Sequence, residues 1–261
     1  VGDCVVVEKA GEIIPQVLES IASKRMTDSV PFEFPTKCPA CSSLLVREEG
    51  EAAWRCPSPV CPEQVKGRLK YFASRACMDI DHLGEAVIEQ LVDQGKARMA
   101  SDLYRLGKED FQSLEGFAEK SAENLFKSIA VSKEAGLPRL LCALGIKHVG
   151  SAAAKELARN FHSLEELAEA SVEKLVEMDG IGSIMAQSIR EFFLDEDNQS
   201  MIGTLTEAGV VTTREEIEAG ELPFAGKSIV LTGSLERFSR SDAAGRIEKL
   251  GGKVSSSVSK K

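Results

Sequence analysis

Four of the seven cysteines in this 261-residue chain fall into two close pairs. Two residues separate Cys38 from Cys41, four separate Cys56 from Cys61, and fourteen lie between the pairs. Closely spaced cysteines can turn two thiolates toward one ion, and two such pairs meet the tetrahedral preference of Zn²⁺. With no fifth ligand in the set, the predicted zinc site is structural and closed. So short a segment has little core, so we expect the metal to supply its folding energy.

Other interpretations of these cysteines stay open: a redox Cys-x-x-Cys motif, a disulfide pair, or chance spacing. A thioredoxin-like motif begins a helix after a strand, whereas prolines crowd both pairs here. An odd, unevenly spread set of cysteines also argues against a secreted disulfide framework. The remaining three, Cys4, Cys77 and Cys142, have no partner nearby in the sequence and are predicted to be packing residues.

A short pattern occurs four times along the chain: an apolar residue, any residue, glycine or histidine, an apolar residue, and glycine or alanine. Its last positions are Gly84, Ala118, Gly150 and Gly182, spaced by 34, 32 and 32 residues. Apolar residues follow four and seven positions later, on one face of a helix that would start at the turn. The sequence therefore predicts an internal repeat of helix-hairpin-helix units.

Such a turn is chemically suited to a phosphate group. It directs backbone N–H groups outward at the start of the second helix, where they have no intrahelical partner and the helix dipole is positive. Binding of this kind reads no base, so it predicts sequence-independent contact with duplex DNA. The alternative, that each glycine only makes a tight turn in a helical bundle, fits any single copy. The predicted DNA-binding residues in this region are Gly84, Gly116, Gly150, Gly180, Gly182, Lys147 and Lys155.

The four copies differ in how well they fit this chemistry. Histidine stands at the first small position in two of them, His82 and His148, and Ala118 replaces the last glycine of another. Those three copies are expected to bind phosphate more weakly. The Gly180–Gly182 turn is the best formed.

Composition indicates an intracellular, mainly helical protein. The chain is 43% hydrophobic and 28% charged, with only 5% aromatic residues. No apolar stretch approaches the ~18 residues of a membrane span and no signal peptide is visible, so we expect no membrane partner.

The net charge of −9 is unevenly distributed. Residues 163–224 carry 3 basic against 15 acidic groups, a balance of −12, whereas residues 225–261 carry 8 against 3, or +5. Because electrostatic footprints are local, contact with DNA is permitted despite the overall charge. Plain solvated faces explain the same runs of charge.

Both ends of the chain read as parts of incomplete domains. Residues 1–15 predict two strands around a glycine turn, which need more sheet to be stable. Residues 228–232, 241–250 and 253–255 predict a strand, a helix and a second strand, too little for a closed domain. We therefore expect a piece of a longer protein, cut at both ends.

The order of these parts resembles the bacterial NAD-dependent DNA ligases over nearly the whole chain. The segment Lys9-Ala10-Gly11-Glu12-Ile13-Ile14-Pro15 is similar to the end of that family's oligonucleotide-binding (OB) barrel, with Glu12 where aspartate is common. The tetracysteine segment matches the family's finger at all four ligands. Three further segments resemble the first half of a BRCT domain: Phe224-x-Gly226-Lys227, Leu231-Thr232-Gly233-x-Leu235 and Gly251-Gly252-Lys253-Val254.

This resemblance implies a multidomain, mainly α fold. Its parts are an OB-barrel end with connector (1–32), a Cys4 zinc finger (33–65), four helix-hairpin-helix repeats (66–211), an acidic linker (212–223) and a truncated α/β BRCT start (224–261). It also implies that Lys9, Ile13 and Ile14 press on DNA near a nick. Thr232 and Gly233 would hold a phosphate in the BRCT half, with a strand-end turn as the alternative.

The resemblance also implies an activity for the intact protein. Such a ligase transfers AMP from NAD to its own lysine and then to the 5′-phosphate at a nick. The 3′-hydroxyl at the nick then displaces the AMP. Mg²⁺ offsets the charge on the phosphoryl group that is transferred. The lysine of that family lies in a Lys-x-Asp-Gly motif, but the sole Asp-Gly here is Asp179-Gly180, preceded by Glu177-Met178. We therefore name no catalytic residue and expect this piece to be inactive alone, its role being to grip DNA.

The expected setting is a monomer bound to nicked double-stranded DNA in the bacterial cytoplasm, serving replication and repair. A non-enzymatic helix-hairpin-helix repair scaffold is the main alternative function. An adaptor that binds proteins through the BRCT half is a third.

Overall fold

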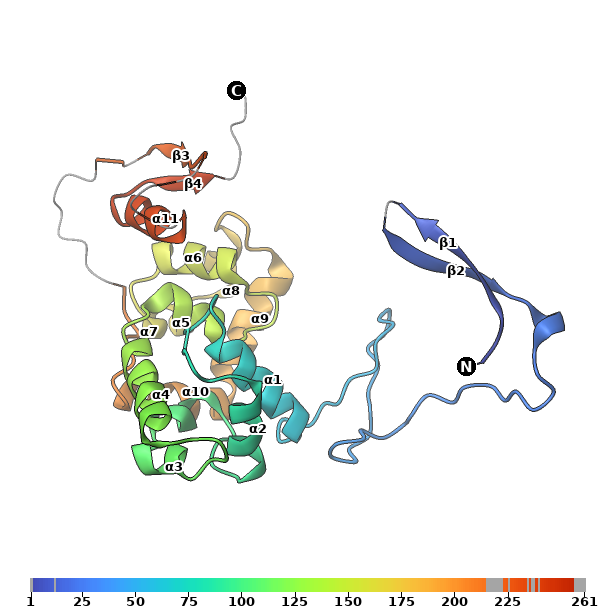
Figure 1. Cartoon of the computed structure of the whole chain (residues 1–261). Helices are drawn as coiled ribbons and strands as arrows, with labels where there is room; N and C mark the ends of the chain where they lie inside the picture. Colours follow the sequence, from blue (N-terminus) through green and yellow to red (C-terminus); the bar gives the residue numbers. More distant parts are fainter. Residues whose placement is uncertain are drawn as a thin grey trace.

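The chain passes in order through a β-hairpin, an irregular cysteine-bearing segment, a group of helices and a small β-α-β unit (Figure 1). The computed structural model describes residues 2–11, 13–214, 223–224, 226–233, 235, 238 and 240–255. Residues 215–222, most of the predicted acidic linker, lie outside the described residues.

The N-terminal hairpin consists of β1 (Val5–Ala10) and β2 (Ile14–Ser20), which pair antiparallel. Gly11, at a φ of +64°, provides the left-handed conformation that its turn needs. The two strands form a sheet of their own, and nearly all their side chains are exposed. Figure 1 shows this hairpin apart from the helices. The predicted glycine turn between two strands is confirmed, whereas an OB barrel stays a prediction.

The segment that carries the four cysteines folds mostly as loops. Two isolated antiparallel bridges organise it, Lys37 with Leu44 and Val46 with Arg55. Helix α1 (Pro62–Ala73) begins directly after Cys61, four residues before the predicted start of the helical region. A proline in the first turn of α1 explains this earlier start, because its fixed φ suits a helix and its missing N–H has no intrahelical acceptor there.

The helices between residues 62 and 207 share one hydrophobic core, which includes the fully buried Phe72, Phe111 and Phe161. Helices that are neighbours in the chain pack in pairs: α1 on α2, α3 on α4, α5 on α6, and α8 on α9. After α1, the helices are α2 (Glu85–Asp93), α3 (Lys108–Gln112), α4 (Glu119–Ser132), α5 (Leu137–Ala143), α6 (Ser151–Asn160), α7 (Leu164–Glu169), α8 (Val172–Val176), α9 (Ser183–Leu194) and α10 (Glu196–Glu207). Two 3-10 helices, η1 (Ala22–Lys24) and η2 (Ala100–Tyr104), complete the described helical elements before residue 214.

The apolar positions predicted from the repeat all lie in this core. Each is four or seven residues after the last position of its copy, on the helix that follows the turn. Their side chains are at most 1% exposed: Ile88, Leu91, Ala122, Leu125, Ala154, Leu157, Ala186 and Ile189. The apolar face predicted for each of these helices is therefore buried.

The C-terminal unit is the β-α-β arrangement expected from the sequence. Strands β3 (Ser228–Val230) and β4 (Lys253–Ser255) pair in parallel, and α11 (Arg240–Lys249) connects them. Glycine is required at position 252, because an added Cβ would lie 2.7 Å from Ile247 and 3.0 Å from Phe224. Among the described residues, no helix is both long and apolar enough to cross a membrane.

Candidate metal centre and nucleic-acid interface

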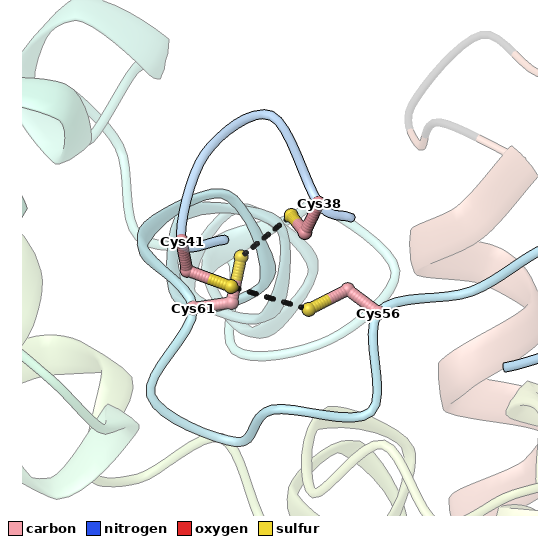
Figure 2. A group of neighbouring side chains, drawn as sticks. All are labelled: Cys38, Cys41, Cys56 and Cys61. Atoms are coloured by element: carbon pink, nitrogen blue, oxygen red, sulfur yellow. Dashed lines mark hydrogen bonds between the residues drawn. The ribbon is translucent and has the colours of Figure 1, made fainter. Parts of the chain in front are cut away.

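The four cysteines predicted as metal ligands come together in space (Figure 2). All four Sγ atoms lie within 4.8 Å of one another. The Sγ atoms of Cys38 and Cys61 lie 3.8 Å apart, and those of Cys41 and Cys56 lie 3.4 Å apart. Four sulfurs at ~2.3 Å from a tetrahedral zinc ion lie about 3.8 Å apart. The donor set and its spacing therefore fit a zinc ion.

Local backbone structure holds each cysteine pair in place. In the first pair, the N–H of Cys38 donates to Ser43 O, and the N–H of Ser42 donates to Cys38 O, both at 2.8 Å. Ser42 makes this tight turn possible with a φ of +62°. In the second pair, Cys61 is the N-cap of α1, so the helix fixes that ligand against the core.

The electrostatics of the cluster also fit a bound cation. Hydrogen bonds with the side chain and backbone of Ser43 lower the pKa of the Cys41 thiol to about 6. At Cys56, a backbone hydrogen bond from Ser58 lowers the pKa, but burial and the neighbouring thiols outweigh it and raise the pKa to about 12. Four thiols this close do not ionise together unaided, because each thiolate repels the next. A divalent cation removes that obstacle.

The four repeated turns share one backbone conformation. In each, the N–H of the fourth residue donates to the carbonyl of the first, at distances from 2.9 to 3.4 Å. The third residue has a positive φ in every copy, as position i+2 of a type II turn requires. These φ angles are +68° at His82, +81° at Gly116, +70° at His148 and +79° at Gly180. The second, third and last residues of each copy are exposed, whereas the first and fourth are buried or half-buried and pack in the core.

A helix starts at the last position of every copy. Gly84, Ala118, Gly150 and Gly182 are the N-caps of α2, α4, α6 and α9, and no side chain caps α2, α6 or α9. The first turns of α2 and α4 carry glutamates, whereas those of α6 and α9 carry no acid. The N-termini of α6 and α9 are therefore the more favourable for an anion.

The fold does not require glycine at three of these N-caps. The φ angles of Gly84, Gly150 and Gly182 lie between −79° and −97°, which any residue adopts, and an added Cβ would meet nothing within 4 Å. Ala118 occupies the equivalent position of the second copy at a φ of −97°. Glycine is a favoured N-cap residue, and at an exposed N-cap it also permits close approach of a ligand to the backbone.

Three family models match the chain. A helix-hairpin-helix motif matches residues 139–202, which include the third and fourth turns. The NAD-dependent DNA ligase C4 zinc finger domain matches residues 37–62, and the BRCA1 C Terminus (BRCT) domain matches residues 219–261.

Similar curated proteins extend this likeness to the whole chain. A protein of Lysinibacillus sphaericus named DNA ligase is 47% identical over 264 residues, which cover 100% of this chain and 40% of that protein. One of Bacillus subtilis with the same name is 48% identical, covering 99% of this chain and 39% of that protein. The chain belongs to the NAD-dependent DNA ligase family. It spans about 40% of the length of the ligases it matches. These matches do not favour the repair-scaffold alternative.

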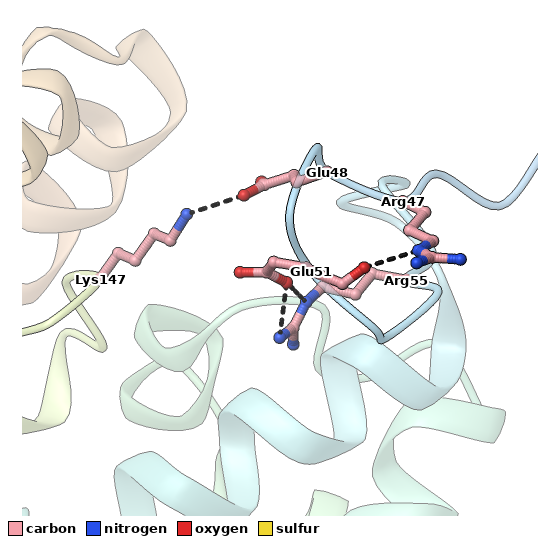
Figure 3. Close-up of polar contacts among 5 residues, drawn as sticks. All are labelled: Arg47, Glu48, Glu51, Arg55 and Lys147. Carbon is pink, nitrogen blue, oxygen red and sulfur yellow. Dashed lines mark hydrogen bonds and ion pairs between the residues drawn. The ribbon is translucent and has the colours of Figure 1, made fainter.

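The other residues predicted to meet DNA occupy separate parts of the chain. Lys147 lies in the third turn, where its ammonium is 3.6 Å from Glu48 (Figure 3). Lys155 is exposed on α6. Lys9, Ile13 and Ile14 are exposed together on the N-terminal hairpin, with Ile13 82% accessible to solvent. In the BRCT half, Thr232 and Gly233 follow β3, where Gly233 has a φ of +74°.

One cluster of buried side chains was not predicted from the sequence. Cys77 and Cys142 are buried with their Sγ atoms 3.3 Å apart, and the Tyr71 hydroxyl lies 3.4 Å from the sulfur of Cys142. Burial raises the pKa of Cys77 to about 11, so this thiol stays protonated and packs as an apolar group. The packing role predicted for Cys77 and Cys142 is confirmed. For Cys4 it is wrong, because that residue is exposed beside an open hairpin.

Arg139 is the second missed element. From α5 its guanidinium donates to the carbonyls of Arg75 and Cys77, both at 2.6 Å, and pairs with Asp79 at 3.2 Å. It thereby ties the connector before the first turn to the helix before the third. The sequence gives no signal for this contact, since the partners of Arg139 lie sixty or more residues away.

Proposed function

We propose that this chain is the DNA-gripping part of an NAD-dependent ligase that seals single-strand nicks in duplex DNA during replication and repair. It binds the sugar-phosphate backbone without reading sequence, as a monomer in the bacterial cytoplasm. The single observation that carries this proposal is the set of four turns with exposed central residues and a common conformation, three of them with an N-cap glycine that the fold does not need.

All four copies act as helix-hairpin-helix units in this proposal. Gly84, Gly116, Gly150, Gly180 and Gly182 bring backbone N–H groups to phosphate oxygens, and Lys147 and Lys155 add charge. The third and fourth copies contribute most, because no acid stands in the first turn of α6 or α9. This ranking differs from the sequence-based one, which placed the third copy among the weaker binders.

The two ends of the chain extend the grip. Lys9, Ile13 and Ile14 sit on an exposed hairpin, where a basic and two apolar side chains suit the surface of DNA beside a nick. Thr232 and the N–H of Gly233 would hold a phosphate at the end of β3.

Cofactors divide between this chain and the rest of the ligase. Cys38, Cys41, Cys56 and Cys61 hold one structural zinc ion that folds the finger. NAD and Mg²⁺ serve the adenylyl transfer of the whole enzyme. These 261 residues hold no Lys-x-Asp-Gly motif, so the chain alone is expected not to form an AMP adduct or to seal nicks.

Fluorescence anisotropy with a labelled nicked duplex tests the proposal. We expect an affinity that is equal for two unrelated sequences and falls steeply as salt increases, because bound counterions are released from phosphates. The double variant Gly150→Ala/Gly182→Ala should bind at least tenfold more weakly while its circular dichroism is unchanged. A matched control is Gly203→Ala, an exposed glycine in α10 whose added Cβ also meets nothing within 4 Å. Equal affinities of the double variant and this control would remove the turns from DNA binding.

A further inference from the structure

The tip of the cysteine-bearing segment reaches the third helix-hairpin-helix turn. This finger tip, residues 47–54, connects Val46 and Arg55, whose backbones pair through two hydrogen bonds of 2.8 and 2.9 Å. Gly50, at a φ of +84°, lets the loop reverse direction. Figure 3 shows Glu48 extending from this loop toward Lys147, which comes from the helical part of the chain.

Contacts within the finger tip decide which of its acids faces outward. Arg47 Nε donates to the carbonyl oxygen of Glu51 at 2.6 Å. Arg55 donates through Nε and Nη2 to the Glu51 carboxylate at 3.2 Å. The charge of Glu51 is thus balanced inside the loop. Glu48 instead places its carboxylate 3.6 Å from Lys147 Nζ, across the gap to the third turn.

Lys147 stands where a phosphate is expected in the proposed function. It is the second residue of the third turn, next to His148 and three residues before Gly150, the N-cap of α6. That helix start has no acid in its first turn and no side-chain cap. A lysine beside an uncapped helix N-terminus attracts an anion, and the anion beside it in this structure is a carboxylate of the protein itself.

We propose that Glu48 occupies the phosphate position of Lys147 in the DNA-free protein and that a phosphodiester group of the duplex replaces it. The inference rests on the proposed DNA binding and identifies one anion site within it. Carboxylate and phosphodiester compete for one ammonium, so Glu48 lowers the affinity for DNA. Both side chains are about 60% exposed, Lys147 at 62% and Glu48 at 59%, so the ion pair is weak and readily exchanged.

The neighbouring acid supplies a matched control. Glu49 is exposed and carries the same charge one residue away, and the structure describes no partner for it. Replacing either residue with glutamine removes one negative charge from the finger tip. A general charge effect on DNA affinity is therefore the same for both variants. An effect that acts through Lys147 belongs to Glu48 alone.

Affinity for the labelled nicked duplex at low salt tests the inference in four variants. Glu48→Gln should bind about two- to fivefold more tightly than wild type, the range expected for an exposed ion pair, and Glu49→Gln should gain less than half as much. Lys147→Met should bind more weakly, and adding Glu48→Gln to Lys147→Met should restore nothing. Zinc content and Trp54 fluorescence confirm that each finger remains folded.

The outcomes separate the two proposals. If wild type binds DNA but Glu48→Gln and Glu49→Gln behave alike, the exchange of Glu48 for phosphate is wrong and DNA binding stands. A gain from Glu48→Gln that persists in the Lys147→Met background also overturns it. If wild type does not bind the duplex at all, the proposed function fails, and this inference fails with it.

Discussion

His148 and Gly180 have the same left-handed backbone conformation, at φ angles of +70° and +79°, although histidine has a bulky side chain and glycine has none. Each is the third residue of a repeated turn, and each precedes an N-cap glycine by two positions. Glycine enters this region without a steric penalty, whereas an L-residue meets a cost of ~1–2 kcal/mol. The third turn therefore holds strain that the fourth does not.

Exchanging residue types at these two turns should change stability in opposite directions. Gly180→Ala is expected to destabilise the protein by about 1 kcal/mol, because alanine meets the left-handed penalty. His148→Gly should stabilise it by roughly 0.5 kcal/mol, because relief of that penalty exceeds the ~0.4–1 kcal/mol of added unfolded-state entropy. Urea unfolding measures both. Gly182→Ala, at a φ of −85°, is the control and should stay within about 0.5 kcal/mol of wild type. An equal loss from both alanine variants contradicts the left-handed assignment.

Removing zinc should unfold the finger and leave the helices intact. The chain has one tryptophan, Trp54, whose ring stacks on Phe34 with centroids 5.6 Å apart inside the cysteine-bearing segment. A strong chelator should therefore change the fluorescence of Trp54 while helical circular dichroism hardly changes, since the finger lacks a core of its own. Cys41→Ser should give the same fluorescence without chelator. Cys4→Ser should behave as wild type. Metal analysis that finds no zinc in purified protein contradicts the assignment.

Replacing Arg139 should weaken the contact between the connector before the first turn and α5, the helix before the third turn. Arg139→Met leaves the carbonyls of Arg75 and Cys77 without this hydrogen-bond donor. We expect the free energy of unfolding to fall by about 1–3 kcal/mol, a range that allows for the partial exposure of the arginine. Arg139→Lys should recover only part, since an ammonium lacks the planar fork that reaches both carbonyls. Chemical denaturation measures the effect. Arg159→Met removes a surface ion pair with Glu156 and serves as the control. An equal decrease in the free energy of unfolding for both variants contradicts the stabilising role of Arg139.

Acid should reduce stability partly through Asp110. Its pKa lies below the ordinary value of 3.8, first because Lys96 donates a hydrogen bond to it at 2.7 Å and then because the Gly107 N–H does so. The folded state binds this proton less readily than the unfolded state. Its stabilising contribution is therefore complete above the unfolded pKa and is lost as pH falls through the folded one. The stability gap between wild type and Asp110→Asn should be constant above about pH 5 and should narrow as pH falls through the unfolded pKa of 3.8 toward the lower folded pKa. A gap that stays constant below about pH 4 contradicts the lowered pKa.

Local spacing in the sequence was enough to predict much of the candidate site. The short spacing within the pairs 38/41 and 56/61 already brings the two thiols of each pair together. Binding of one ion by all four thiols predicts that the two pairs converge, and they do. The periodicity predicts the repeated turns and the helices after them, and the alanines, leucines and isoleucines at the predicted positions are buried. The backbone conformation of each turn is a local property. It is encoded by the few residues that form it.

The contacts between distant segments were decided only by tertiary structure. The 3.3 Å approach of Cys77 to Cys142 joins residues 65 positions apart, and Glu48 meets Lys147 only because the finger tip extends to the third turn. The contacts of Arg139 also depend on tertiary structure, because it binds backbone carbonyls, which every residue has and which no sequence pattern marks. A sequence pattern specifies which elements form and which face is apolar. How those elements pack, and so which exposed charges face one another, depends on the shape of the whole core.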